Sequence, residues 1–206
     1  DVNRAVEAAK KAWPEWREST PAARAEVLLK LADLIDEHTD ELAELESQNV
    51  GKPLAAARDE MPVCSDNIRF FAGAARILEG RATGEYMAEH TSWIRREPVG
   101  VVGQIAPWNY PLMMAVWKFA PALAAGNVSV LKPSEQTPLS TLRFAQLGTD
   151  VIPPGVLNVI TGDGEPVGAG IVRHPDVRMV SLTGDVATGK EVAKAAADTL
   201  KRVHLE

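Results

Sequence analysis

The spacing of apolar residues divides the chain into a helical N-terminal part and a C-terminal part in which strands and helices alternate. In the first part, apolar residues recur every three or four positions, as on one face of an amphipathic helix. Proline suits the first turn of a helix and glycine often follows the last turn. The helices that these patterns predict cover residues 1–14, a segment from Pro21 with Ser19 or Thr20 as its cap, a segment from Thr39 or Asp40 to Gly51, and residues 54–78.

Residues 81–98 break the helical pattern and predict a β-hairpin. Two short runs of mixed apolar and polar residues, 86–90 and 92–96, flank a turn, which is typical of paired strands. An isolated two-stranded hairpin is only marginally stable in water, which favours a hairpin that packs against a partner. The other interpretation, a surface hairpin without a partner, stays open.

The stretch from Val99 to Pro138 predicts a β-α-β unit around which the other elements are arranged. Residues 99–105 and 128–131 are β-branched runs too short for stable helices, and they are typical of buried strands. An apolar helix, 111–125, separates them. Beyond this unit the sequence predicts a helix at 139–150, a strand at 156–160, a helix ending near 173, a strand at 178–182, a helix ending near 200 and a strand from 203. This alternation predicts an α/β fold with a mainly parallel sheet covered by helices on both faces.

Two loops at strand ends form the candidate ligand site. Ligands of open α/β sheets bind beyond the carboxyl ends of the strands. The loops 106–110 and 132–138 both follow strands, so we expect them to be neighbours. The first offers an indole and a side-chain amide, and the second offers an ammonium and a carboxylate. Together they predict a pocket for a polar ligand that carries a flat ring.

A glycine-spaced turn follows the strand at 156–160. Residues 162–168 read G-x-G-x-x-x-G, one residue longer than the dinucleotide-binding fingerprint. The spacing alone is a weak signal. The strand before it and the helix after it strengthen the interpretation that it approaches a nucleotide.

Composition narrows the classes of function. The chain has 206 residues, 46% of them hydrophobic, and a net charge of −6 without a basic cluster, which argues against nucleic acid as a partner. Without an apolar run of about 18–20 residues, no membrane span is expected. The single cysteine, Cys64, excludes an internal disulfide, and with no visible signal peptide it fits a cytoplasmic location. The four histidines show no metal-ligand spacing, so no metal site is expected.

Four blocks carry a resemblance to a known family. PWNYP, WKFAPALAAGN, LKPSEQTP and SLTGDVATG occur in the order and spacing of the aldehyde dehydrogenase superfamily, which the chain resembles from Val99 to Glu206. The segments IAPWNYPLMMAVWK and RMVSLTG are most similar to γ-aminobutyraldehyde and betaine aldehyde dehydrogenases. The resemblance implies NAD as cofactor, an (amino)aldehyde such as γ-aminobutyraldehyde as substrate, a carboxylic acid as product, and a homodimer or homotetramer.

The resemblance also implies how the chain is divided. Residues 1–80 are expected to be N-terminal helices of the NAD-binding domain, 81–98 a hairpin of the oligomerisation region, and 99–206 the Rossmann-like NAD-binding core. Since members of this family are much longer, we expect the chain to be a fragment without the catalytic domain. The family's nucleophilic cysteine lies beyond Glu206, and Cys64 is interpreted as a packing residue.

Three residues are assigned to catalysis by the resemblance. Asn109 is expected to donate a hydrogen bond to the oxyanion formed when the cysteine attacks an aldehyde, although asparagine is also a common turn residue. Glu206 matches the general base that activates water to hydrolyse the thioester; alternatively, it is a terminal or appended residue. Lys118 matches a lysine with a proposed role in proton relay or cofactor contact; alternatively, it extends to the surface.

The implied cofactor and substrate contacts come from the loops and the glycine-spaced turn. Lys132 and Glu135 are expected to bind the adenosine ribose, and the carboxylate should repel a 2′-phosphate and favour NAD over NADP. Asp185 departs from the family's usual serine and is interpreted as a helix N-cap beside the pyrophosphate. Tyr110 and Trp117 are expected to attract a substrate's distal ammonium. The other expected cofactor residues are Ile105, Ala106, Pro107, Trp108, Ser134, Gly164, Gly168, Thr183, Gly184 and Thr188.

Two other functions stay open from the sequence. One is a non-catalytic nucleotide-binding or assembly fragment. The other is part of a relative that passes the acyl group to coenzyme A or phosphate instead of water. Glu206 is the one residue that argues for hydrolysis.

Overall fold

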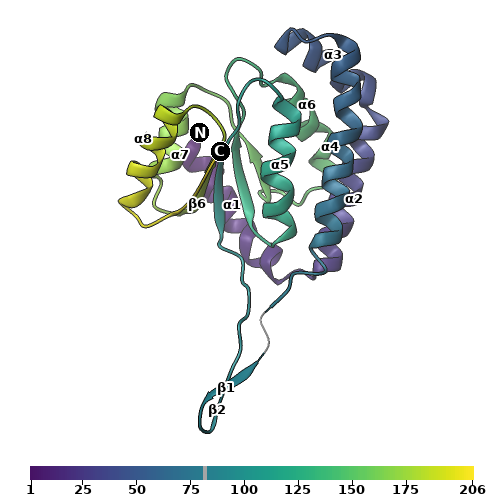
Figure 1. Cartoon of the computed structure of the whole chain (residues 1–206). Coiled ribbons are helices and arrows are strands. Elements are labelled where there is room, and N and C mark those ends of the chain that lie inside the picture. The colour runs from purple at the N-terminus through teal and green to yellow at the C-terminus, as the bar shows by residue number, and fades with distance from the viewer. Residues whose placement is uncertain (81–82) are drawn as a thin grey trace.

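A computed structural model describes residues 1–80 and 83–206, so the first two residues of the predicted hairpin segment lie outside the described part. Figure 1 shows an α/β body from which a hairpin extends. The helices are α1 (Val2–Glu18), α2 (Pro21–Glu37), α3 (Thr39–Val50), α4 (Leu54–Ala74), α5 (Pro111–Ala124), α6 (Leu139–Leu147), α7 (Ala169–Arg173) and α8 (Val186–Ala197), with short turns η1 (Gly148–Asp150) and η2 (Gly164–Gly168). The strands are β1 (Gly84–Met87), β2 (His90–Ser92), β3 (Val101–Ile105), β4 (Val128–Lys132), β5 (Leu157–Val159), β6 (Val177–Leu182) and β7 (Arg202–Leu205).

The cap of α2 and the end of α3 lie where the sequence signals predict. The prediction that the first helix ends at residue 14 is wrong, because α1 continues through Pro14 to Glu18 and buries Trp16. The hydroxyl of Thr20 caps α2 by accepting a hydrogen bond from the backbone N–H of Ala23 at 3.2 Å. Gly51 ends α3 with a φ of 84°, a conformation that glycine adopts without steric cost. The prediction that the next helix reaches residue 78 is wrong, because α4 ends at Ala74. Ile77 and Leu78 are exposed, so burial of apolar surface does not favour a further turn.

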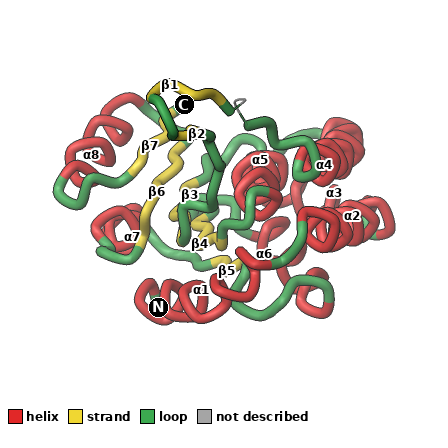
Figure 2. Tube along the Cα trace, turned by 90° about the horizontal axis from the view of Figure 1, so that it is seen from below, coloured by secondary structure: helices red, strands yellow, loops and turns green. Residues whose placement is uncertain are grey.

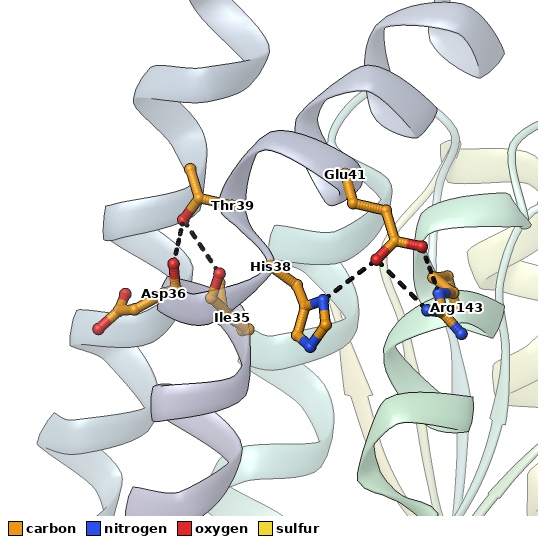
Figure 3. A network of polar contacts seen from close by, with 6 residues as sticks. All are labelled: Ile35, Asp36, His38, Thr39, Glu41 and Arg143. Carbon is orange, nitrogen blue, oxygen red and sulfur yellow. Dashed lines mark hydrogen bonds and ion pairs between the residues drawn. The ribbon is translucent and has the colours of Figure 1, made fainter.

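A polar network joins α2 and α3 to α6 (Figure 3). The hydroxyl of Thr39 donates to the carbonyl of Ile35 at 3.0 Å and stabilises the junction between α2 and α3. In the first turn of α3, the carboxylate of Glu41 accepts from the guanidinium of Arg143 on α6 at 2.6 Å and lies 3.1 Å from Nδ1 of His38. The network fixes the N-terminal helices on the α/β core.

The larger sheet has five parallel strands in the order β5-β4-β3-β6-β7. Figure 2 shows α1, α7 and α8 on one face of this sheet and α5 and α6 on the other. Every residue of β4 is buried, and the rings of Phe119 and Phe144 stack at 5.4 Å between α5 and α6. The predicted parallel sheet with helices on both faces is confirmed.

The hairpin is confirmed, but the predicted positions of its strands are wrong. The strands pair antiparallel over 84–87 and 90–92, so the turn falls at Ala88 and Glu89 and not near residue 91. Glu89 has a φ of 63°, as expected for a residue in a tight two-residue hairpin turn. The predicted second strand reached residue 96, yet 93–96 form no regular strand. The turn therefore sets the register, because the exposed strands have no buried face that could set it.

Candidate cofactor and catalytic site

The two predicted site loops lie side by side at the carboxyl edge of the sheet. The N–H of Ala106, directly after β3, donates to the carbonyl of Lys132 at 3.0 Å. The hydroxyl of Thr137 donates to the carbonyl of Trp108 at 3.1 Å. The sheet pairs β3 with β4 in parallel, so the loops that follow these strands emerge together.

Lys132 and Glu135 form an ion pair at this edge. The ammonium of Lys132 lies 2.8 Å from Oε2 of Glu135 and also donates to the carbonyl of Pro133 at 3.2 Å. The lysine is 2% exposed, whereas the glutamate side chain is 45% exposed. The hydrogen bond from Lys132 lowers the pKa of Glu135, so its carboxylate stays ionised and available to hydroxyl donors.

A cavity of about 670 Å³ opens between α7 and α8 at the same edge. Ligand pockets commonly have volumes of about 300–1,000 Å³. The expected cofactor residues that line it are Ile105, Lys132, Gly164, Gly168 and Thr188. The expected residues outside this lining are Ala106, Pro107, Trp108, Ser134, Glu135, Thr183, Gly184 and Asp185.

Sequence reasoning missed three cations of this cavity: Arg173, Lys190 and Lys194. With Lys132 they make four cationic side chains in the lining, against two carboxylates, Glu165 and Glu191. Charged residues on helices are usually solvated, so only the packing of α7 beside α8 brings these together. Three of these cations are already ion-paired: Arg173 with Glu165 at 3.1 Å, Lys194 with Glu191 at 2.7 Å, and Lys132 with Glu135 at 2.8 Å. With Glu135 counted, the cations exceed the carboxylates by one, which favours an anionic ligand.

Asp185 is the N-cap of α8, as the sequence predicted. Its Oδ1 accepts from the backbone N–H groups of Ala187 and Thr188 at 2.8 and 3.0 Å, and its Oδ2 accepts from the Thr188 hydroxyl at 2.6 Å. The hydrogen bond from that hydroxyl is the main cause of the lowered pKa of Asp185. Two backbone N–H groups of the first turn of α8 therefore already donate to the carboxylate of Asp185.

A second cavity, of about 360 Å³, lies beside α5 over β6 and β7. The ammonium of Lys118 lies within it, donating to the hydroxyls of Ser181 at 3.0 Å and Thr183 at 2.9 Å. Lys118 is 7% exposed, so its side chain does not extend to the surface. Burial lowers the pKa of Lys118 to about 8, although the negative charge of Glu206 opposes the shift.

Glu206 also lines this second cavity. Its N–H donates to the carbonyl of Leu182 and its own carbonyl accepts from Gly184, each at 3.0 Å, so the backbone extends the parallel pairing of β6 and β7. The carboxylate Oε2 accepts from the hydroxyl of Thr183 at 3.3 Å. Two of the three expected catalytic residues thus share one cavity, whereas Asn109 is exposed in its loop and lies outside that lining.

The two aromatic residues expected at the substrate entrance lie in different surroundings. Trp117 lines the second cavity and is 40% exposed. The ring of Tyr110 has the ammonium of Lys52 at 4.4 Å from its centroid, so a cation of the chain itself already occupies one face. That ammonium is paired with Glu60 at 2.6 Å and lies 3.6 Å from the fully buried Glu46.

Cys64 is fully buried on α4, and burial is the main cause of the raised pKa of its thiol. The thiolate is the nucleophilic form of cysteine, so this side chain is unsuited to attack a substrate. Over residues 1–80 and 83–206, no three histidine, cysteine or acidic side chains gather into a group that could hold a metal ion. Within the same described ranges, no helix is both long enough and apolar enough to cross a membrane.

An α/β sheet with a cationic cavity at its carboxyl edge is the arrangement of a nucleotide-binding domain. The sequence model of the aldehyde dehydrogenase family matches residues 1–206, so the chain belongs to this family. It is similar to the NADP/NAD-dependent aldehyde dehydrogenase PuuC of Escherichia coli, with 44% sequence identity. The match covers the whole of this chain and 42% of PuuC.

Solved structures agree with this assignment. An NAD+ complex of an aldehyde dehydrogenase from Bacillus cereus matches with a TM-score of 0.96 and 45% identity over the whole chain and 43% of that protein. Betaine aldehyde dehydrogenase of Staphylococcus aureus, in complex with NAD+, matches with a TM-score of 0.96 and 41% identity over the whole chain and 42% of that protein. The chain thus spans well under half the length of these relatives.

Proposed function

We propose that this chain is the cofactor-binding part of an NAD-dependent aldehyde dehydrogenase. The observation that carries the proposal is the ion pair of Lys132 and Glu135 beside a cavity with a surplus of positive charge. The two relatives described above as NAD+ complexes support the same cofactor. When bound, NAD would accept a hydride from the substrate.

The residues at the carboxyl edge fit a dinucleotide. Lys132 would donate to a ribose hydroxyl while Glu135 accepts from its neighbour. Arg173, Lys190 and Lys194 would offset the charge of the pyrophosphate. Because Glu135 stays ionised, it would repel a 2′-phosphate, so we propose that NAD is preferred over NADP.

The second cavity would serve the hydrolytic half of the reaction. Glu206 would take a proton from the water that attacks the thioester, and the ammonium of Lys118 would stabilise the resulting charge. This pairing favours release of an acid over transfer to coenzyme A or phosphate. Because Cys64 is buried, we propose that the nucleophile comes from another part of the protein and that this chain alone is inactive.

We propose an aminoaldehyde, with γ-aminobutyraldehyde as the example, as the substrate. Trp117 would present an aromatic face to the distal ammonium of the substrate. The similarity to a betaine aldehyde dehydrogenase, whose named substrate carries a cationic nitrogen, supports this choice. Asn109 would hold the oxyanion, since its exposed side chain is free to turn towards a partner domain.

The hairpin would join copies of the whole protein into a homodimer or homotetramer. It extends away from the body (Figure 1), and its apolar side chains, such as Tyr86 and Met87, are 84% and 61% exposed. Exposed apolar groups of this kind mark interaction surfaces. The unpaired thiol of Cys64 supports a reducing, cytoplasmic setting for this enzyme.

The test uses the whole enzyme that contains this chain. Formation of NADH is followed with NAD and either γ-aminobutyraldehyde or butyraldehyde. We expect oxidation of both and a higher catalytic efficiency on the amino derivative. Equal efficiencies would reject the aminoaldehyde preference, and absence of NADH with any aldehyde would reject the enzymatic proposal.

A further inference from the structure

The ammonium of Lys52 lies among two carboxylates and the aromatic ring that precedes α5. Its Nζ donates to Oε2 of Glu60 at 2.6 Å and lies 3.6 Å from Oε1 of Glu46. It also lies 4.4 Å from the centroid of the Tyr110 ring. A cation at this distance over an aromatic ring is attracted by the negative face of the ring. The lysine therefore links acidic side chains of α3 and α4 to the loop that leads into α5.

The turn between α3 and α4 fixes the backbone of Lys52. The N–H of Gly51, in the left-handed conformation that ends α3, donates to the carbonyl of Ser47 at 2.9 Å. The hydroxyl of Ser47 donates to the carbonyl of Lys52 at 2.7 Å. Pro53, whose ring fixes its φ, then leads directly into α4. The backbone is thus held on both sides of Lys52, and its side chain is only 12% exposed.

Glu46 gives a reason for the ammonium to stay inside. The side chain of Glu46 is fully buried, and burial raises the pKa of its carboxyl group. The nearby hydroxyl of Ser140 and the positive charge of Lys52 oppose that rise. A buried carboxylate without a cation beside it is costly, so Glu46 favours the inward position of the ammonium. Glu60, the closer carboxylate, fixes where the ammonium lies.

Asn109 lies directly before Tyr110, in a loop that is held on both sides of it. The carbonyl of Trp108 accepts from the hydroxyl of Thr137 at 3.1 Å. The carbonyl of Tyr110 accepts from the N–H of Met114 at 2.8 Å, in the first turn of α5. Asn109 itself is exposed, so the direction of its amide depends on how its two neighbours are held.

We propose that Lys52 is a positioning residue for the amide of Asn109. Its ammonium holds the ring of Tyr110, and the held ring keeps the preceding residue in the orientation that donates to the oxyanion. This inference rests on the proposed oxyanion role of Asn109. A hydrogen-bond donor stabilises developing charge most when it is already in place, because no reorganisation is then needed during the reaction.

The chemistry of each member gives variants that separate the contacts. Methionine has a similar length without charge, so Lys52→Met removes the contact with the ring and leaves the buried Glu46 without its cation. Tyr110→Leu removes the aromatic ring and keeps the ion pairs of Lys52. Tyr110→Phe keeps the ring and therefore keeps the attraction for the ammonium.

The experiment measures the first turnover of the whole enzyme. Enzyme saturated with NAD is mixed with butyraldehyde, which has no ammonium, and the rate of NADH formation is recorded. We expect Lys52→Met and Tyr110→Leu to slow it about tenfold, within the range that a cation–π contact is worth. Tyr110→Phe should recover most of the rate lost in Tyr110→Leu, and NAD affinity should not change. As a control, Lys30→Met removes an exposed lysine that pairs with Glu26 on α2 and should react as the wild type does.

The decisive comparison repeats both variants in an enzyme that carries Asn109→Ala. This change removes the oxyanion amide and should by itself slow the first turnover by about 10²–10³-fold. Because Lys52 acts through Asn109, adding Lys52→Met or Tyr110→Leu should slow the reaction no further. A general structural role, or a direct contact of Tyr110 with the substrate, would instead cost the same factor in both backgrounds.

Tyr110→Leu decides the outcome if Lys52→Met fails to fold, because it leaves Glu46 paired. A wild-type rate in Tyr110→Leu, or an equal loss with and without the amide of Asn109, would overturn the proposal. A wild-type rate in Asn109→Ala would reject the oxyanion role, and this inference with it. A wild-type enzyme that forms no NADH would reject the proposed function as a whole.

Discussion

The ammonium of Lys118 lies 2.9 Å from the hydroxyl of Thr183, although the two residues are 65 positions apart in the chain. The contact exists because β6 joins the sheet next to β3, and α5 packs on the face of the sheet opposite to α7. Helix α5 packs on β3. The side chain of Lys118 extends from α5 to the carboxyl end of β6. The ammonium is therefore buried among hydroxyls and not solvated.

The first prediction concerns the titration of Lys118. Because burial lowers its pKa to about 8, the side-chain signal of Lys118 should titrate well below those of exposed lysines. Nuclear magnetic resonance of the isotopically labelled lysine side chains measures this, and Lys118→Arg assigns the signal. Glu206→Gln should lower the pKa of Lys118 further, because the carboxylate favours the protonated amine. Titration of Lys118 near 10.5, the ordinary pKa of a lysine, would contradict the burial.

The lowered pKa of Lys118 also makes the free energy of unfolding depend on pH. Between pH 8 and 10.5 the unfolded chain still holds the Lys118 proton that the folded chain has released. The free energy of unfolding should therefore increase with pH across this window, by about 1.4 kcal/mol per pH unit at most from this group. Denaturant unfolding at several pH values measures this slope. Lys118→Met should remove this contribution, and an unchanged slope in that variant would assign it to other groups.

The second prediction concerns cofactor preference. Glu135→Gln removes the charge that would repel a 2′-phosphate, whereas the amide still accepts hydrogen bonds. Repulsion in a partly exposed site is on the order of 1–2 kcal/mol, so the catalytic efficiency with NADP relative to NAD should rise about five- to thirtyfold in the whole enzyme. As a control, Lys132→Met should weaken the use of both cofactors. An unchanged ratio in Glu135→Gln would remove Glu135 from the ribose site.

The third prediction concerns the carboxylate at the start of α8. Asp185→Ser keeps an N-capping hydroxyl and removes the negative charge near the proposed pyrophosphate position. NAD should bind several-fold more tightly to this variant of the whole enzyme, and the gain should shrink as salt is added. Asp185→Ala should in addition destabilise the chain by about 0.5–2 kcal/mol through the lost cap. If NAD affinity of Asp185→Ser equals that of the wild type at low salt, the carboxylate does not act on the cofactor.

The fourth prediction concerns the packing of α7 on the sheet. A Cβ at Gly103 would overlap the side chain of Ile171, so Gly103→Ala should destabilise the chain by about 1–3 kcal/mol. Gly189 inside α8 is a matched control, since its Cβ would lie 3.8 Å from Leu205, an ordinary contact. Gly189→Ala should stabilise by roughly 0.5–1 kcal/mol. Denaturant midpoints measure both, and equal effects of the same sign would contradict the packing.

The sequence predicted the parallel sheet and the loop that carries Lys132 because these depend on short-range signals. Buried β-branched runs mark the strands, and the carboxyl ends of parallel strands meet at one edge. The N-cap at Asp185 was predictable for the same reason, since a capping side chain bonds within three residues. The helix starts at Pro21 and Pro111 follow from the fixed φ of proline.

Features that depend on sheet order or on exposed strands were not predictable. The contacts of Lys118 with Ser181 and Thr183 require β6 beside β3, which no local pattern encodes. The cations Arg173 and Lys194 become neighbours of one cavity only when α7 packs beside α8. The predicted positions of the hairpin strands are wrong because the apolar Trp93 suggests a strand, whereas in the structure it is exposed and lies outside β2.

A crystal structure of the whole enzyme with NAD bound tests the account most directly. We expect the adenosine ribose to lie within hydrogen-bond distance of Lys132 and Glu135, and the pyrophosphate to lie at the cavity between α7 and α8. A nucleotide bound elsewhere, with Lys132 still paired to Glu135 and no ribose beside them, would contradict the assignment of this edge as the cofactor site.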